Sequence, residues 1–224
     1  MNYRHVLFDL DGTLTDPGVG ITKSVQYALE RMGIESDLES LKLFVGPPLQ
    51  ETFRERFGFS REETDRAIGY YREYFGETGI YENELYPGIT ELLQQLIQAG
   101  ATLHVATSKP TVFAQRILEH FGISEYFHTV AGSFLDGTRT DKSEIIQSVL
   151  EDNGIAKHTA VMIGDRKHDL IGAANNAIAS IGASYGYGSV EELEAHSPVA
   201  IVHTVHELAE LLLASDRQSS EAVK

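Results

Sequence analysis

Two carboxylates stand two residues apart at the start of the chain, in the stretch VLFDLDGT. Asp9 and Asp11 directly follow an apolar run that is typical of a buried strand. A carboxylate can attack phosphorus and give an acyl phosphate that water then hydrolyses, and a second carboxyl group can carry the proton. We therefore expect Asp9 to be a nucleophile and Asp11 to be its general acid and base.

Hydroxyl and ammonium groups with a matching chemistry follow later in the chain. The apolar run LHVA ends in Thr107, Ser108 and Lys109, and Lys142 opens a helix-period stretch after SFLDGTRTD. Thr107 or Ser108 would donate a hydrogen bond to a phosphate oxygen, with Thr107 the stronger candidate, and Lys109 is a further candidate for binding the phosphate or the substrate. Lys142 would offset the charge shared by Asp9 and the phosphoryl oxygens.

A second acidic pair, Asp165 and Asp169, follows the apolar run AVMIG in the stretch GDRKHD. Asp9, Asp11 and Asp165 would repel one another in one pocket, and a hard divalent cation would relieve that repulsion. Mg²⁺ fits best, because it prefers oxygen ligands and keeps waters in its shell. Asp169 would hold a metal-bound water or orient Lys142, and its alternative function is to cap the helix that begins beside it.

Two loops are candidates for binding the substrate. Gly12 and Thr13 continue the first acidic pair, and a glycine there lets backbone amides approach a phosphate and form an anion nest. Gly46 and Pro47 belong to FVGPPL, a stiff loop of the kind that an inserted domain would point into a site.

The elements that must position these residues alternate between strand and helix. In the later part of the chain, stretches with helical periodicity lie between the short β-type runs. Several of these helical stretches end on glycine. This alternation predicts an α/β fold, a doubly wound parallel sheet whose reactive residues gather beyond the carboxyl ends of the strands. The β-type runs cover residues 6–8, 102–107, 128–132, 160–164, 179–184 and 200–204.

Residues 17–86 interrupt the alternation with helical patterns only, at 20–33, 37–46, 48–58 and 61–79. Such a segment is longer than a simple crossover between parallel strands. We expect residues 1–16 and 87–224 to form a Rossmann-like catalytic core and residues 17–86 to form an inserted helical cap. The segments DPG (16–18) and LYPG (85–88) would be its hinges, and the polar tail 215–224 would be frayed.

The composition of the chain argues against several classes of partner and site. The formal net charge of −15 would repel nucleic acid, and the chain has no cysteine for a disulfide or a zinc–thiolate site. No apolar run approaches the roughly 18 residues that a spanning helix needs, and the N-terminus has no signal-like core. We expect a cytoplasmic protein that is a monomer or homodimer and contacts neither nucleic acid nor membrane.

The motifs DLDGT (9–13), VATSK (105–109), Lys142 and GDRKHD (164–169) resemble, in this order, the four motifs of the haloacid dehalogenase superfamily of phosphohydrolases. The resemblance covers the whole chain, and FVGPPL, SFLDGTRTDK and SYGYGS resemble its phosphoglycolate-phosphatase-like members. It implies Asp9 as the nucleophile, which ligates the metal by its carboxylate, and Asp11 as the acid/base, which ligates by its backbone carbonyl. It also implies Asp165 as a ligand.

The expected substrate is a small phosphorylated metabolite, with 2-phosphoglycolate ahead of a nucleoside 5′-monophosphate. Many phosphoglycolate phosphatases continue the first motif as Asp-Ser, whereas Asp16 here precedes Pro17, which leaves the substrate open. A sugar phosphomutase of the same architecture is one alternative. A receiver-like signalling module, phosphorylated on aspartate and recognised by a partner, is another.

Side chains of the inserted segment complete the candidates. Lys23, Lys42 and Arg54 could meet a carboxylate or second phosphate of the substrate, although a solvated charge is the simpler interpretation of each. An aromatic row in the last helical pattern has the spacing of a packed helix face rather than a substrate platform. Its members are Tyr70, Tyr71, Tyr74 and Phe75.

Overall fold

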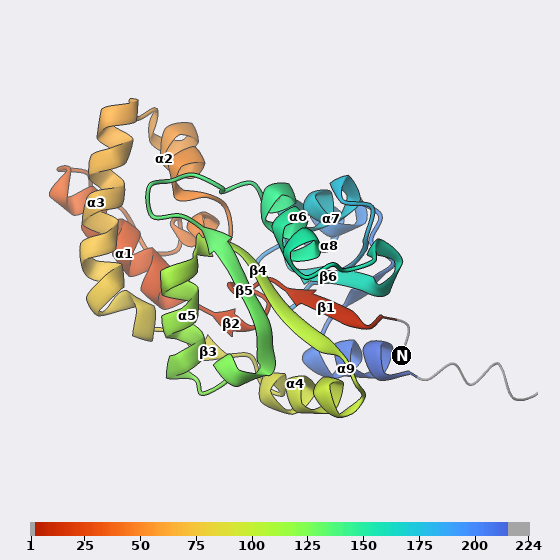
Figure 1. Ribbon diagram of the computed structural model, residues 1–224. Coiled ribbons are helices and arrows are strands. Elements are labelled where there is room, and N and C mark those ends of the chain that lie inside the picture. The colour runs from red at the N-terminus through yellow and green to blue at the C-terminus, as the bar shows by residue number, and fades with distance from the viewer. Residues whose placement is uncertain (1–2, 215–224) are drawn as a thin grey trace, which may run out of the picture.

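A six-stranded, fully parallel sheet forms the centre of the computed structural model, which describes residues 3–214 (Figure 1). The strand order is β5-β4-β1-β6-β7-β8, so the first strand of the chain lies in the middle. The predicted α/β class with an inserted helical segment is confirmed, while the predicted frayed tail lies outside the described residues. The strands are β1 (His5–Phe8), β4 (Thr102–Pro110), β5 (Phe127–Ser133), β6 (Ala160–Gly164), β7 (Ala179–Ala183) and β8 (Ala200–Val202).

Helices cover both faces of the sheet, as the near-continuous apolar strands require. Successive residues of β1 alternate between the faces: Val6 and Phe8 join the core under α4 (Ile89–Gln98), α5 (Thr111–His120) and α9 (Val205–Leu213). Leu7 joins the core under α6 (Lys142–Asp152) and α7 (Lys167–Asn175). The middle strand is therefore buried on both sides, and the position of its end is fixed.

The inserted helices α1 (Gly18–Arg31), α2 (Leu49–Phe57) and α3 (Arg61–Glu77) lie together beyond one end of the sheet (Figure 1). A two-stranded antiparallel ribbon, β2 (Thr15–Asp16) with β3 (Glu84–Leu85), connects them to the core at the two predicted hinges. The ribbon was not predicted, because a two-residue strand carries no periodicity. The proposed boundaries at residues 17 and 86 fall beside it.

Helix α3 begins at a capping box. The Ser60 side chain accepts a hydrogen bond from the Glu63 amide, and the Glu63 carboxylate accepts one from the Ser60 amide. Two otherwise unpaired amides are satisfied in this way, typically stabilising a helix by about 1 kcal/mol. The helix then buries Tyr71 and Phe75, as the spacing of the aromatic row predicts for a packed face.

The helix predicted over 37–46 was wrong. The Asp37 side chain accepts a hydrogen bond from the Ser40 amide at 3.0 Å, and the Ser40 hydroxyl donates to the Asp37 carbonyl at 2.8 Å. These local bonds compete with helical bonds, and only the short 3₁₀ helix η1 (Lys42–Phe44) forms. The other elements that the pattern did not predict are α8 (Val190–Glu194), η2 (Gly79–Tyr81), η3 (Ser124–Tyr126) and η4 (Lys157–Thr159).

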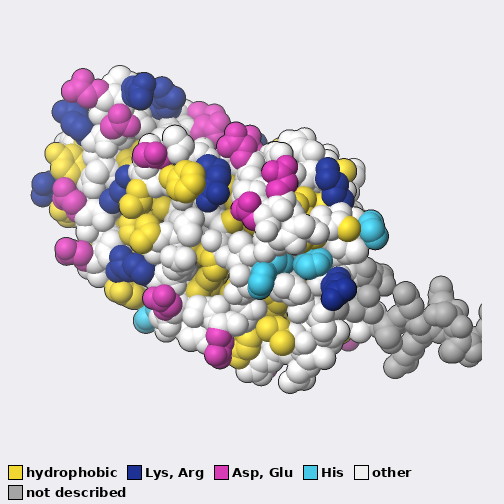
Figure 2. Space-filling view, viewed as in Figure 1, with side chains coloured by type: hydrophobic (Ala, Val, Ile, Leu, Met, Phe, Trp, Pro, Cys, Tyr) yellow, Lys and Arg dark blue, Asp and Glu magenta, His cyan; other side chains and the backbone are white. Residues whose placement is uncertain are grey.

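Acidic and basic side chains are interspersed on the face that Figure 2 shows, including the surface of the inserted helices. Within residues 3–214, every helix is too short or too polar to cross a membrane.

Candidate active site

The carboxyl ends of three neighbouring strands build the site. Strand β1 pairs with β4 on one side and with β6 on the other, and the Asp9 amide donates to the Ile163 carbonyl at 2.9 Å. Asp9, Thr107 and Asp165 therefore stand at one edge, as parallel pairing of these strands requires. All three side chains are buried.

Lys142 reaches this edge from the first turn of α6. Asp141 caps the helix by accepting from the Ser143 amide at 2.7 Å, which fixes where the lysine starts. The Lys142 ammonium then lies 2.8 Å from both Asp9 Oδ1 and Asp169 Oδ1, and donates to the Ala106 carbonyl at 2.9 Å.

Burial opposes the charge of Lys142, but the carboxylates of Asp169 and Asp9 outweigh it and raise its pKa. The lysine is thus held as a fixed positive charge beside the proposed nucleophile.

Three carboxylates converge next to this lysine. Asp9, Asp165 and Asp169 each offer an oxygen, and these oxygens lie within 4.8 Å of one another. Burial and the charges of Asp169 and Asp9 raise the pKa of Asp165 well above its usual range. Burial also raises the pKa of Asp169, to about 6, against the opposing effect of Lys142.

Asp169 contacts both the start of α7 and Lys142. One oxygen accepts from the Arg166 amide at 3.1 Å, which caps α7, and the other faces Lys142.

The oxygens of this cluster fit a hard divalent cation. Asp165 is fully buried, and its Oδ1 has no hydrogen-bond partner among residues 3–214. A buried carboxylate oxygen without a partner is costly unless a cation approaches it. Oxygen donors alone are the ligand set that suits Mg²⁺. The Asp11 side chain is absent from this cluster within the described residues, which leaves its backbone carbonyl, the ligand atom that the resemblance implies.

Asp11 instead forms an ion pair with Lys109. Its Oδ2 lies 2.8 Å from the Lys109 ammonium, and both side chains are almost buried. The same ammonium lies 4.4 Å from the centre of the Phe75 ring, which comes from α3. Burial raises the pKa of Asp11, and Lys109 partly offsets that effect. A carboxyl group with a raised pKa is suited to donating a proton.

Gly12 and Thr13 occupy a tight turn after the strand. The Gly12 amide donates to the Thr15 carbonyl at 2.7 Å and the Thr13 amide to the Leu10 carbonyl at 3.3 Å, so neither is free for the expected anion nest. Gly12 has a φ of 83°, and a Cβ there would collide with the Asp165 carboxylate. The requirement for glycine is therefore close packing against Asp165.

The loop SYGYGS follows β7 (Ala179–Ala183) and contacts the site. The Tyr187 amide donates to Asp165 Oδ2 at 2.8 Å, and the Tyr185 hydroxyl donates to the Thr13 carbonyl at 3.0 Å. The Tyr187 hydroxyl donates to Asp16 in the hinge ribbon. A Cβ on Gly186 would collide with the Gly12 carbonyl. This loop orients Asp165 and contacts the hinge.

Each hydroxyl at the end of β4 makes a hydrogen bond within the chain. Thr107 Oγ1 accepts from the Lys109 amide at 3.3 Å, and the Ser108 hydroxyl donates to the Thr140 carbonyl at 3.2 Å. Of the two, Thr107 is the more buried, and Ser108 faces a cavity.

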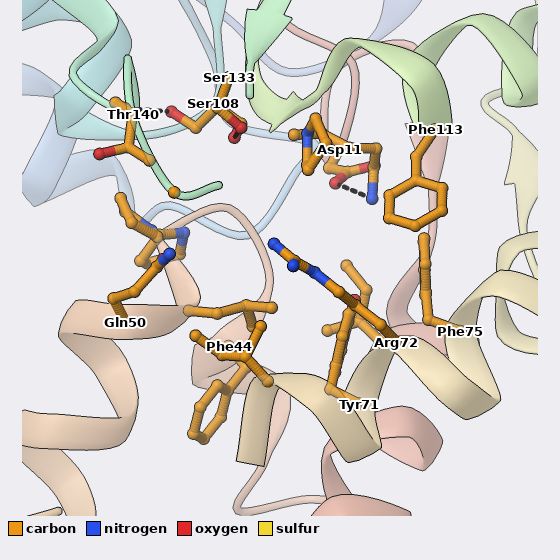
Figure 3. A pocket seen from close by; sticks show the side chains of 18 of the residues that line it. Asp11, Phe44, Gln50, Tyr71, Arg72, Phe75, Ser108, Phe113, Ser133 and Thr140 are labelled. Carbon is orange, nitrogen blue, oxygen red and sulfur yellow. Dashed lines mark hydrogen bonds and ion pairs between the residues drawn. The ribbon is translucent and has the colours of Figure 1, made fainter. Parts of the chain in front are cut away.

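That cavity lies between the sheet edge and the inserted helices (Figure 3). Asp11, Ser108 and Lys109 line its sheet side, and the predicted Gly46 and Pro47 also line it. The further lining residues that the inserted segment contributes include Phe44, Pro48, Gln50, Tyr71, Arg72 and Phe75, and the core contributes Phe113 and Phe134.

Several of these contacts were not predicted. Arg166 follows Asp165 and donates to the Val45 carbonyl at 3.0 Å, while its Nε donates to Glu192 at 2.9 Å. It thus ties the Gly46-Pro47 loop to the core. The proposed cap cations do not line this cavity: Lys23 pairs with Glu82 and Lys42 pairs with Glu39. Arg54 lines a neighbouring cavity that Ser108 and Lys142 also line.

Comparisons with known proteins agree with this geometry. Residues 6–183 match the model of the haloacid dehalogenase-like hydrolase family. The chain is 52% identical over 199 residues to a 5′-nucleotidase of Pseudomonas aeruginosa, covering 88% of this chain and 90% of the relative. It is 41% identical over 212 residues to the tyrosine-protein kinase PtkA of Mycobacterium tuberculosis, covering 92% and 72%. A phosphoglycolate phosphatase of Vibrio parahaemolyticus is 27% identical over 219 residues, covering 94% and 96%.

Solved structures share the fold of this chain. The crystal structure of a "predicted phosphatase" from Clostridium acetobutylicum superimposes with a TM-score of 0.92 at 49% identity, covering 95% of this chain and 99% of that one. The family match spans most of the chain and contains Asp9, Asp11, Thr107, Lys142 and Asp165. The protein is a phosphatase that belongs to the haloacid dehalogenase-like hydrolases.

Proposed function

We propose that the protein is a Mg²⁺-dependent phosphomonoesterase that transfers the phosphoryl group of its substrate to Asp9 and then to water. The observation that carries the proposal is the environment of Asp9. Its carboxylate is buried 2.8 Å from Lys142 and shares a cluster with Asp165 and Asp169. A carboxylate in this setting is held in place, has its charge compensated, and stands beside a cation site.

The chain's own groups supply the steps. An Asp9 oxygen forms a bond to phosphorus while the bond to the leaving oxygen breaks, and Asp11 gives its proton to that oxygen. Water then attacks the acyl phosphate, Asp11 takes the proton of that water, and phosphate leaves with Asp9 regenerated. Lys142 and the Thr107 hydroxyl stabilise the charge on the phosphoryl oxygens throughout.

Asp9, Asp165 and the Asp11 carbonyl would hold Mg²⁺, with Asp169 beside them. When bound, the ion supplies positive charge to the phosphoryl oxygens and offsets the repulsion among the carboxylates. Among residues 3–214, two ammonium groups, Lys142 and Lys109, form ion pairs with members of the set Asp9, Asp11, Asp165 and Asp169, which leaves two excess negative charges among these groups if every one is ionised. One divalent cation balances that excess.

For the substrate, we favour a nucleoside 5′-monophosphate over 2-phosphoglycolate, which reverses the order suggested by the sequence motifs. The relative named 5′-nucleotidase is 52% identical to this chain, and the phosphoglycolate phosphatase is 27% identical. The cavity beside Asp11 has walls from Phe44, Phe75 and Phe113. Aromatic walls suit a flat base better than a small charged acid. The cap would also exclude water during transfer.

Release of phosphate from a panel of phosphomonoesters, with Mg²⁺ and with EDTA, tests the proposal. The panel holds nucleoside 5′-monophosphates, 2-phosphoglycolate and hexose phosphates. We expect phosphate release that requires Mg²⁺, highest with a nucleotide. Absence of turnover on the whole panel would contradict hydrolysis. Interconversion of hexose phosphates would point to a mutase, and a stable aspartyl phosphate without turnover would point to a signalling module.

A further inference from the structure

Arg72 differs in its pairing from the other charged residues that line the cavity. It lies on α3, one residue after Tyr71, and Figure 3 shows its guanidinium extending from that helix into the space facing Asp11. Among residues 3–214, no carboxylate forms an ion pair with Arg72 and no acceptor takes a hydrogen bond from it. Its five donors are therefore available to a ligand.

The two lysines nearest to the reaction contrast with it. Lys109 is paired with Asp11 and Lys142 with Asp9 and Asp169, each at 2.8 Å. These lysines are held by the site itself, whereas Arg72 is partly buried without a partner. Burial lowers the pKa of Arg72, because partial desolvation disfavours the charged form. A desolvated guanidinium without acceptors is unfavourable, so a ligand that supplies acceptors would gain from reaching it.

The surroundings of Arg72 indicate which class of ligand would bind it. Phe44, Phe75 and Phe113 line the same cavity as Arg72 and make part of its wall apolar. The phosphoryl group is expected on the sheet side, at Asp9, so Arg72 faces the leaving group. Flat apolar walls with one planar cluster of donors match a flat ring that carries carbonyl or ring-nitrogen acceptors.

We infer that Arg72 is the specificity-determining residue of the cap and binds acceptor atoms on the nucleobase of the substrate. This inference rests on the proposed phosphatase function. It adds that Arg72 selects the substrate by binding its leaving group. A carboxylate, as in 2-phosphoglycolate, offers acceptors to a guanidinium too, but it leaves the aromatic walls without a partner. The two sources of acceptors can be distinguished by paired substrates.

Each pair differs only in the group that Arg72 would bind. A nucleoside 5′-monophosphate is compared with ribose 5-phosphate, which lacks the base. 2-Phosphoglycolate is compared with ethyl phosphate, in which a methyl group replaces the carboxylate. Steady-state kcat/KM is measured for all four with the wild type, Arg72→Met, Arg72→Lys and the control Arg66→Met. Arg66 lies on the same helix but is exposed and outside this cavity.

We expect Arg72→Met to lower the ratio of kcat/KM for the nucleotide to that for ribose 5-phosphate by about 10- to 100-fold, chiefly through KM. Arg72→Lys should recover part of the ratio, because it keeps the charge but loses the planar fork of donors. Arg66→Met should behave as the wild type. Thermal unfolding of each variant controls for loss of fold.

An unchanged nucleotide ratio in Arg72→Met would overturn the inference. A selective loss within the 2-phosphoglycolate pair alone would overturn the assignment to a base in favour of a carboxylate. Failure of the wild type to hydrolyse all four esters would contradict the proposed function itself, and is thus separate from a failure at Arg72.

Discussion

The two walls of the cavity are built on different principles. On the sheet side each ammonium has its carboxylate: Lys142 contacts Asp9 and Asp169, and Lys109 contacts Asp11. On the cap side Arg72 lines the cavity together with Phe44, Tyr71 and Phe75, and it has no such partner within the described part of the chain. The sheet wall is organised to hold one invariable group, the phosphoryl group. By our inference, the donors of Arg72 on the cap wall bind the part of the substrate that varies.

The largest effect should come from the nucleophile on the sheet wall. Asp9→Asn is expected to lower kcat by about 10⁴-fold or more, because the amide is nearly isosteric but is a poor nucleophile. The free energy of unfolding should change by less than about 2 kcal/mol, since Lys142 keeps Asp169 and the Ala106 carbonyl. Phosphate release and urea unfolding measure the two quantities. Wild-type turnover would remove Asp9 from the mechanism.

Lys142 should connect catalysis to stability. Lys142→Met leaves Asp9 and Asp169 buried without their cation, so we expect a loss of about 3–5 kcal/mol in unfolding free energy along with loss of turnover. Urea unfolding of the metal-free protein measures the first effect. Lys157→Met, at an exposed position, is the control. A stability equal to the wild type would show that the carboxylates do not depend on this lysine.

Replacing Asp165 should stabilise the metal-free protein, whereas replacing Lys142 should destabilise it. Its raised pKa means that the folded chain binds this proton more tightly than the unfolded chain, so acidification stabilises the fold and ionisation at higher pH penalises it. Asp165→Asn removes that penalty, and we expect the metal-free variant to be more stable than the wild type at pH 8, by about 2 kcal/mol. The advantage should shrink toward pH 5.

The same variant should lose the stabilisation that Mg²⁺ gives the wild type, since a ligand that binds the folded state raises its stability. Thermal unfolding with and without Mg²⁺, across the pH range, measures both effects. An equal Mg²⁺-induced shift in both proteins would place the ion elsewhere.

The smallest effect should come from the contact between the walls. Arg166→Gln removes the hydrogen bond to the Val45 carbonyl and the pairing with Glu192, and so loosens the Gly46-Pro47 loop. We expect KM to rise about 3- to 10-fold with little change in kcat, because the loop lines the leaving-group side. Lys167→Gln, its exposed neighbour, is the control. A loss confined to kcat would instead assign Arg166 to the chemistry.

The sequence predicted the sheet wall far better than the cap wall. Asp9, Thr107 and Asp165 each follow an apolar run, and parallel pairing places such residues at one edge, so their order along the chain was sufficient. Arg72 has no comparable signal. It lies in YYREYF, where an arginine beside packed aromatic residues is indistinguishable from a solvated charge until the helix is placed against the sheet.

Hydrogen bonds that the sequence pattern does not reveal explain the other differences between the predictions and the structure. The segment 37–46 has a helical pattern, but the Asp37 side chain captures the Ser40 amide and a turn forms instead. The amides of Gly12 and Thr13 are used by the turn that follows β1, which no residue type reveals. Contacts between distant segments, such as Tyr187 with Asp16, depend on the tertiary fold.

The central claim is that the phosphoryl group passes through Asp9. Mixing the enzyme with a substrate labelled in its phosphoryl group, quenching in acid within milliseconds and mapping the tryptic peptides measures this directly. We predict label on the peptide that contains Asp9, localised to that residue by fragmentation, with a yield that rises and decays as turnover proceeds and with no label in Asp9→Asn. Turnover without label at Asp9, or label at another residue, would contradict the account.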